Sequence, residues 1–418
     1  MSSRRNTVYF LIIVMLLSGL FTGRAFFFNL AYLLGALLII AYFWSFFSVR
    51  GIAISRKTRS RRAQVGRNLE EVFVVQNRAV IPKLWLEIRD ESDLPGHKAS
   101  HVVPALGVRS QYRWYVDTPC LVRGEFHLGP LTVVSGDPFG LFSSPRKLAA
   151  SQRVIVYPQT IPIDDFVLPM GRLTGGEAER RRTPNVTTNV SGIRDYVHGD
   201  SFNRIHWKST SRHGHLMVKE FEIDPLADIW MMVDFSSFSL VEASSVRRMH
   251  HGAGPVIPMG KAIPPSTEEY AVVIAASLAQ YFIDSERALG FSAYIPHREV
   301  FQPERGNRQL LQILRSLAIA RSLTPYTLAQ MLSLETPHFS RGTTLVIITA
   351  SIDPAWINEA QLLARKGIRP TCVLIDPSSF GAHADIDEVR TMLRVARIPT
   401  IIIRLGDDLS AALAQHPL

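Results

Sequence analysis

The feature that most constrains this chain is an apolar segment near its N-terminus, residues 25–49, that contains no charged side chain. About 20 residues at roughly 1.5 Å each cross the hydrocarbon core of a bilayer, so this segment is long enough to span it with some tilt. A second apolar stretch, residues 8–21, is shorter and marginal by the same measure. A short turn containing Gly23 separates the two stretches, and we expect a transmembrane helical hairpin within residues 1–67.

The distribution of charge predicts the orientation of this hairpin. The chain carries 46 basic and 36 acidic residues, a net charge of +10. Residues 1–67 contain ten basic residues and no acid, so the rest of the chain is neutral. Seven of the ten lie in residues 50–67, against Arg24 alone in the turn, and basic flanks are retained on the cytoplasmic side. We expect a two-span protein of the cell (inner) membrane with cytoplasmic domains and no nucleic-acid partner.

The alternative for the first apolar stretch is a cleaved signal peptide that begins with Arg4 and Arg5. The candidate cleavage site includes Arg24, which disfavours cleavage there. Cleavage would leave the second apolar segment in the same orientation. The remaining chain is expected to face the cytoplasm on either interpretation.

Residues 68–168 are predicted to form a small antiparallel β domain of the sandwich or barrel type. Apolar residues alternate along short runs, as at Leu84, Leu86 and Ile88, and this is the period of a β-strand. Turn-forming Gly and Pro residues separate these runs. No catalytic constellation is recognised in this segment.

Residues 169–225 contain a polar linker and a dense motif rich in charged and aromatic residues. The arginine run at residues 180–182 is predicted to be solvated, because neighbouring acids offset part of its charge. Tyr196 and Trp207 are expected to bury their rings while their polar ends reach partners. The spacing of four histidines matches no common metal-ligand pattern: His198, His206, His213 and His215.

Residues 226–418 are predicted to form an α/β domain with a doubly wound parallel sheet. Near-continuous runs of Val, Ile and Leu alternate with helical segments, as in sheets that are covered by helices on both faces. The expected strands are residues 229–233, 289–295, 344–349, 371–375 and 400–404. The expected helices are residues 267–285, 309–317, 328–334, 354–365 and 386–395.

The motifs together resemble domain of unknown function 58, the MoxR-associated membrane proteins, over essentially the whole chain. The segments that carry the resemblance are residues 123–124, 128–130, 137–142, 194–200, 204–208 and 218–222. The chain departs from the family pattern at His206, where an acid usually precedes the Trp. The resemblance implies a von Willebrand factor A-like domain, a MoxR-type AAA+ ATPase as partner, an association with transglutaminase-like membrane proteins, and no settled enzymatic activity.

The first strand of the predicted α/β domain ends at a degenerate metal motif. Ligands of open α/β sheets bind beyond the carboxyl ends of the strands, where Asp234 stands. The von Willebrand factor A-like site uses D-x-S-x-S, a Thr on a second loop and an Asp on a third, which are oxygen ligands suited to Mg²⁺. Asp234 and Ser236 match, and Thr267 is the second-loop candidate. Phe238 and Ala350 replace two expected ligands, so we expect weak magnesium binding at most. The alternative is that Asp234 and Ser236 cap the strand end.

Two functions from different classes are compatible with the sequence. The first is a non-enzymatic membrane-tethered adaptor whose α/β domain docks an ATPase. The second is a membrane-associated hydrolase with an unrecognised active site. The sequence contains no G-x-S-x-G elbow, no G-x-x-x-x-G-K-[ST] phosphate loop and no H-E-x-x-H helix, which favours the adaptor.

Overall fold

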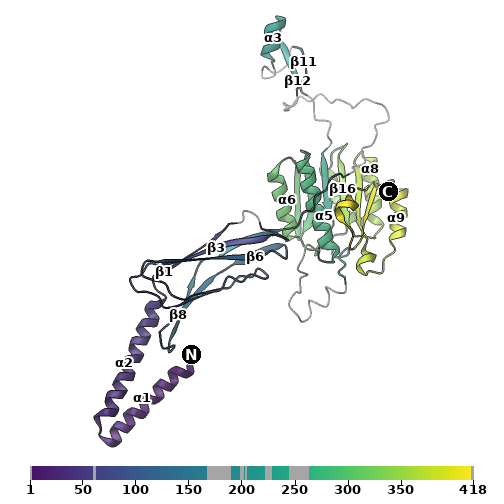
Figure 1. Ribbon diagram of the computed structural model, residues 1–418. Coiled ribbons are helices and arrows are strands. Elements are labelled where there is room, and N and C mark those ends of the chain that lie inside the picture. Colours follow the sequence, from purple (N-terminus) through teal and green to yellow (C-terminus); the bar gives the residue numbers. More distant parts are fainter. Residues whose placement is uncertain are drawn as a thin grey trace. The chain divides into compact units, whose positions relative to one another are not determined.

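The structure is a computed structural model that describes residues 2–59, 63–166, 190–197, 202, 205–221, 228–243 and 263–415 (Figure 1). The chain divides into two compact units between Gln159 and Thr160. The first unit contains the apolar helices and antiparallel sheets. The second contains a small hairpin from the dense motif and an α/β sheet.

Two helices, α1 (Ser2–Thr22) and α2 (Ala25–Ser48), open the first unit (Figure 1). Gly23 in the turn between them has a φ of +65°, a conformation that favours glycine. α1 is longer than the apolar stretch that predicted it, because polar residues including Arg4 and Arg5 extend it toward the N-terminus. Both helices are long and apolar enough to cross a membrane, a test that a signal sequence also passes.

The rest of the first unit consists of sheets with the strand orders β1-β3-β6, β5-β4-β8-β9 and β2-β10-β7. The strand bounds are β1 (Ile52–Thr58), β2 (Ala63–Gln64), β3 (Asn68–Asn77), β4 (Leu86–Asp90), β5 (His101–Val103), β6 (Gln111–Pro119), β7 (Gly124–Leu128), β8 (Leu131–Gly136), β9 (Ser143–Leu148) and β10 (Gln152–Tyr157). The first two sheets pack around a shared apolar core that includes Phe73, Leu86 and Val133. β1 and β2 lie within residues 50–67, which the sequence analysis assigned to the basic flank of the helical hairpin.

The second unit contains a six-stranded sheet of order β15-β14-β13-β16-β17-β18. Its strands are β13 (Ile229–Val233), β14 (Leu289–Ile295), β15 (His297–Glu304), β16 (Thr344–Thr349), β17 (Arg369–Ile375) and β18 (Thr400–Ile403). β15 is antiparallel to β14, and the other neighbours are parallel. The expectation of an entirely parallel sheet is therefore wrong at this edge. Arg298 and Pro303 on β15 are residues typical of an edge strand, which lacks the apolar run that identified the others.

Helices pack on both faces of this sheet (Figure 1). The helix bounds are α5 (Thr267–Asp284), α6 (Asn307–Ile319), α7 (Leu328–Glu335), α8 (Ala355–Arg365), α9 (Ile386–Val395) and α10 (Leu409–Leu413). Trp230 and Met232 on β13 share a core cluster with Leu332 on α7 and Trp356 on α8. Alternate residues of a strand face opposite sides, and α5 contacts β13, β14, β16 and β17 on the other side.

A small hairpin with a helix is formed by part of the dense motif, and we call it the signature hairpin. Its elements are β11 (Val190–Asp195), α3 (Trp207–His213) and β12 (Met217–Phe221). β11 and β12 are antiparallel, with a register shift between Val190 and Gly192 on β11. Ile205 and Val218 are buried between these elements.

A buried cluster of titratable side chains connects the two main sheets of the first unit. Arg56 on β1 places Nε 3.0 Å from Oε1 of Glu71 on β3, and Nη2 2.7 Å from Oδ2 of Asp90 on β4. His97 lies with Nε2 2.7 Å from the same Asp90 oxygen, and with Nδ1 2.7 Å from the Thr118 hydroxyl. The side chains of Arg56, Glu71, Asp90 and His97 are at most 3% exposed.

The two carboxylates of this cluster respond differently to their surroundings. Burial raises the pKa of Glu71, and the charges of Arg56 and His97 offset only part of this rise. Burial acts in the same direction on Asp90, but hydrogen bonds to His97 and Ser92 and the charge of Arg56 bring its pKa below the usual range. A buried charge without its partner strongly destabilises the folded state. The folded β domain therefore needs the Arg56 cation beside both carboxylates.

We expect Arg56→Ala to lower the free energy of unfolding of the β domain by about 3 to 5 kcal/mol, because Glu71 and Asp90 would remain buried without their cation. Lys57→Ala is the matched control, since Lys57 is the next residue on β1 and is exposed. It should change the free energy by less than about 0.5 kcal/mol. Denaturant unfolding of the detergent-solubilised chain, followed by circular dichroism, measures both. Equally small effects of the two substitutions would contradict the role of Arg56.

Candidate functional site

Asp234 joins the carboxyl ends of two neighbouring strands, β13 and β16. It follows β13 directly and is 4% exposed. Its Oδ2 accepts a 2.7 Å hydrogen bond from Oγ1 of Thr349, the last residue of β16. Its Oδ1 accepts a 2.9 Å bond from the backbone N–H of Ser236. Asp234 therefore lies at the edge where open α/β sheets bind ligands, with both carboxylate oxygens bonded to the protein.

The hydroxyl groups near Asp234 are bonded to one another and to the backbone. Ser236 donates from Oγ to Ser239 Oγ over 3.0 Å, and Ser239 donates to the Ser236 carbonyl over 3.0 Å. Thr267, the first residue of α5, donates to the Ser239 carbonyl and accepts from the N–H of Val241. The structure thus brings Asp234 and Ser236 together, whereas Thr267 binds the backbone of the loop that follows them.

As arranged, the oxygen atoms of this set are engaged in hydrogen bonds with the protein. Mg²⁺ demands near-octahedral oxygen ligands, and the Asp234 oxygens already accept two protein hydrogen bonds. Phe238 is exposed in the second serine position, and Ala350 has no side-chain oxygen. Within the described residues, no group of three or more His, Cys, Asp or Glu is placed to hold a metal. Magnesium binding by Asp234, Ser236 and Thr267 stays a prediction, and the contacts match the capping alternative.

Sequence reasoning did not identify Thr349 as the partner of Asp234, although a signal was present. Both residues stand at the carboxyl ends of predicted strands. In the parallel register, Val233 on β13 lies opposite Ile348 on β16, so the next residue of each strand also meets the other. Knowing that these two strands are neighbours would have been enough to pair them.

His206 caps the helix of the signature hairpin. It is the N-cap residue of α3, and its Nδ1 accepts a 3.2 Å hydrogen bond from the N–H of Ser209. Asp is among the preferred N-cap residues and would accept the same bond, so His206 retains the capping role of the acid that the resemblance leads us to expect. Asp195 and His215 form an exposed pair, with 2.9 Å between Oδ1 and Nε2.

The expectation that the Trp207 ring is buried is wrong, because its side chain is 66% exposed. The hairpin is small, and the residues of α3 include none that is buried. Other large apolar side chains of the hairpin are also exposed, namely Ile193, Val197, Phe202 and Leu216. The basic residues Lys208 and Arg212 of α3 are exposed beside them in the sequence. The motif thus presents aromatic and basic groups instead of enclosing them.

Several residues that the sequence analysis singled out lie outside the described part of the chain. They are the arginine run 180–182, His198, Asp200 and Arg204. The three described histidines of the motif, His206, His213 and His215, belong to no metal-binding group within the described residues.

The pKa of Asp234 determines how this residue affects stability. Burial raises the pKa of Asp234, and the hydrogen bonds from Thr349 and Ser236 offset part of the rise. Because the folded pKa lies above the unfolded value of about 3.9, the folded state binds the proton more tightly. The carboxyl therefore costs no stability below the unfolded pKa, and the cost develops as pH rises to the folded pKa.

We expect Asp234→Asn to leave the free energy of unfolding at neutral pH unchanged or higher, because the amide keeps an acceptor for Ser236 and removes the buried charge. Asp234→Ala should cost about 1 to 3 kcal/mol, since it leaves Thr349 and Ser236 without their acceptor. Thermal unfolding of both variants between about pH 4 and about pH 8 measures these effects. A large loss of stability in Asp234→Asn at neutral pH would contradict them.

The same measurement with Mg²⁺ or EDTA separates the capping and metal interpretations. Neither reagent should shift the unfolding midpoint of the wild-type chain. If Mg²⁺ raises the unfolding midpoint of the wild-type chain but not that of Asp234→Asn, Asp234 binds the ion.

Residues 192–252, which include most of the signature hairpin, match the family model described as Protein of unknown function DUF58. Uncharacterized protein YeaD of Bacillus subtilis (strain 168) is 22% identical over 283 residues, which are 66% of this chain and 64% of that protein. The chain thus spans less than two thirds of the length of this curated relative.

Two solved structures resemble parts of the fold at low sequence identity. The conserved hypothetical protein BatB from Bacteroides thetaiotaomicron is 11% identical with a TM-score of 0.31, over 45% of this chain and 96% of that one. A von Willebrand factor type A structure from Catenulispora acidiphila is 15% identical with a TM-score of 0.28, over 45% of this chain and 40% of that one. The match at residues 192–252 and the similarity to YeaD support a relationship between this chain and the DUF58 family.

Proposed function

We propose that this DUF58 protein is a membrane-anchored scaffold on the cytoplasmic face of the cell membrane, and that it binds a MoxR-type AAA+ ATPase. The observation that carries the proposal is the exposure of two large aromatic side chains, Trp207 and Phe202, on the signature hairpin. Aromatic residues of this kind are enriched among those that dominate protein–protein binding. Because the rings contribute little to the core of the hairpin, we assign them to the interface with the partner.

The charge of the signature hairpin supports a partner with an acidic surface. α3 carries Lys208 and Arg212 and no acidic residue. Complementary charge at the rim of an interface speeds association and excludes partners of the wrong sign. We therefore propose that the ATPase contributes an apolar pocket for Trp207 with acidic residues around it.

The α/β domain of the scaffold is proposed to be von Willebrand factor A-like and doubly wound. Two features support this: the sheet extends from β13 to β14 on one side and to β16 on the other, and helices cover both faces. Since Asp234 is satisfied by Thr349 and Ser236, docking is proposed to need no metal ion.

Helices α1 and α2 are proposed to be the membrane anchor. Basic residues stand at the start of α1 and directly after α2, namely Arg4, Arg5 and Arg50, whereas Arg24 stands alone in the turn. This asymmetry supports an outward turn and cytoplasmic domains. A transglutaminase-like membrane protein is a further proposed partner, and no nucleic-acid partner is proposed because the charge excess is confined to residues 1–67.

The alternative function, a membrane-associated hydrolase, requires a nucleophile with a base beside it. The contacts of Asp234 are hydroxyl and backbone donors from Thr349 and Ser236. No observation at this edge of the sheet favours the hydrolase over the scaffold.

We expect Trp207→Ala to weaken binding of the full-length protein to a MoxR-type ATPase by at least about tenfold, the effect of truncating a dominant interface residue. Because Trp207 is exposed, the thermal unfolding midpoint of the Trp207→Ala variant should stay near that of the wild type. Phe238→Ala is the matched control, since Phe238 is a 72% exposed aromatic residue at the edge of the α/β sheet. Biolayer interferometry with and without EDTA measures both variants.

The two variants also distinguish the docking surfaces. Weaker binding in Phe238→Ala alone would place the ATPase at the edge of the α/β sheet instead of the signature hairpin. If the wild-type chain binds no such ATPase under any of these conditions, the proposed partner is wrong.

We expect the β and α/β domains to resist protease added outside intact cells, because the basic flanks retain them in the cytoplasm. Digestion should begin once detergent permeabilises the membrane, with an exported reporter protein as the control for protease access. Cleavage of either domain in intact cells would contradict the orientation.

A further inference from the structure

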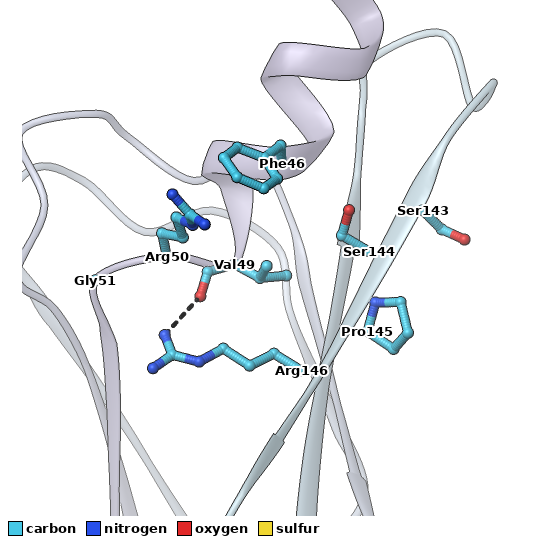
Figure 2. Close-up of a pocket in the computed structure, with 8 residues that line it drawn as sticks. All are labelled: Phe46, Val49, Arg50, Gly51, Ser143, Ser144, Pro145 and Arg146. Atoms are coloured by element: carbon cyan, nitrogen blue, oxygen red, sulfur yellow. Dashed lines mark hydrogen bonds between the residues drawn. The ribbon is translucent and has the colours of Figure 1, made fainter.

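A cavity of about 710 Å³ lies where α2 meets the β domain, and we call it the junction cavity (Figure 2). Its lining comes from α2, from the turn that follows α2, and from β9, namely Phe46, Val49, Arg50, Gly51, Ser143, Ser144, Pro145 and Arg146. The chain thus places two arginine side chains, the Ser144 hydroxyl and an aromatic ring around one opening, whereas the Ser143 hydroxyl points away from the arginines (Figure 2).

The two arginine side chains of the junction cavity keep their positive charge available to a ligand. The Arg50 guanidinium carbon lies 3.7 Å from the centroid of the Phe46 ring. Arg146 donates one hydrogen bond from Nη1 to the Val49 carbonyl, at 3.3 Å, and Figure 2 shows both guanidinium groups beside Val49. Over the described residues, no carboxylate forms an ion pair with either side chain. The cavity therefore presents a net positive charge.

Contacts between α2 and the β domain hold these groups in place. Lys83 is buried and donates from Nζ to the Phe47 carbonyl over 2.7 Å. The hydroxyls of Ser45 on α2 and Ser144 on β9 lie 2.9 Å apart. The Lys83 and Arg146 cations satisfy carbonyl groups at the carboxyl end of α2 and offset the negative end of its dipole. An anion can therefore approach this helix end without meeting uncompensated carbonyl groups.

We propose that the junction cavity binds the phosphate of an anionic phospholipid. The inference rests on the proposed anchoring of α2 in the membrane, which puts the end of the apolar helix, and the arginines after it, at the depth of the lipid headgroups. Guanidinium groups bind phosphate oxygens with paired, charge-assisted hydrogen bonds, and a serine hydroxyl such as that of Ser144 can donate a further one. The ring of Phe46, 38% exposed on the same opening, is available to the glycerol and upper acyl carbons.

Native mass spectrometry of the detergent-solubilised full-length chain with short-chain phosphatidylglycerol tests the site. We expect one tightly bound lipid per chain, and an affinity about tenfold lower in Arg50→Gln and in Arg146→Gln, which each remove a charge-assisted contact. Lys147→Gln is the matched control. It removes the same charge from the next residue of β9, which is not among the residues that line the cavity, and it should bind lipid like the wild type.

Two further ligands test which chemical group the junction cavity recognises. Phosphatidylcholine, whose cationic headgroup offsets its phosphate charge, should bind more weakly than phosphatidylglycerol. Inorganic phosphate at the same concentration should not displace the bound lipid. Equal binding of the two lipids, unchanged affinity in both arginine variants, or full displacement by inorganic phosphate would each overturn the proposal.

Carbonate extraction of membranes that contain the wild-type chain separates this inference from the proposed anchor. A chain that stays in the membrane but shows no selective binding of phosphatidylglycerol overturns the headgroup site and leaves the anchor intact. Release of the chain by carbonate overturns the anchor, and with it the lipid as the occupant of the cavity.

Discussion

The first unit depends on the ion pairs that the buried guanidinium group of Arg56 forms. Three residues separate the end of α2 from the start of β1, on which Arg56 reaches Glu71 on β3 and Asp90 on β4. Because β3 and β4 belong to different sheets, these ion pairs fix the two sheets against each other. β4 pairs with β8, which pairs with β9, and Ser144 on β9 contacts Ser45 on α2. The end of α2 is thus held by its covalent link to β1 and by the second sheet.

The sequence predicts buried parallel strands well, because each reads as one apolar run. β13, β14 and β16 match their predicted bounds, and all of their residues are buried. β15 is half-exposed and carries charged residues, so it has no comparable signal. In β3, the alternation of apolar residues indicates a strand but not its inward face: Phe73 and Val75 are buried, and Glu71 lies on the same side. A carboxylate on the inward face could be anticipated only by knowing that the Arg56 side chain of β1 reaches it.

The candidate sites show where sequence reasoning stops. Asp234 could be placed because the carboxyl ends of parallel strands share an edge, but the partner of Thr267 depends on the path of a loop. The sequence predicts a buried Trp207 ring, whereas the structure exposes it. Whether a ring is enclosed depends on the size of the surrounding element, which residue composition does not reveal. Arg146 lies on β9, which follows a turn. In this turn the Asp137 carboxylate accepts hydrogen bonds from the N–H groups of Phe139 and Phe142. The turn is readable from the sequence, whereas its position against the helix is not.

Basic residues near the N-terminal apolar helices have different roles once the chain is folded. Arg56 belongs to the basic flank in the sequence, but it is enclosed and neutralised by Glu71 and Asp90, so it adds little to the field at the protein surface. Arg146 comes from the neutral part of the chain, yet it lies beside Arg50 at the end of α2 without a carboxylate partner in the described residues. Counting charges along the sequence therefore gives the sign of the surface at the end of α2. The residues that form this surface are those whose charges remain unpaired after the β domain has folded against the helix.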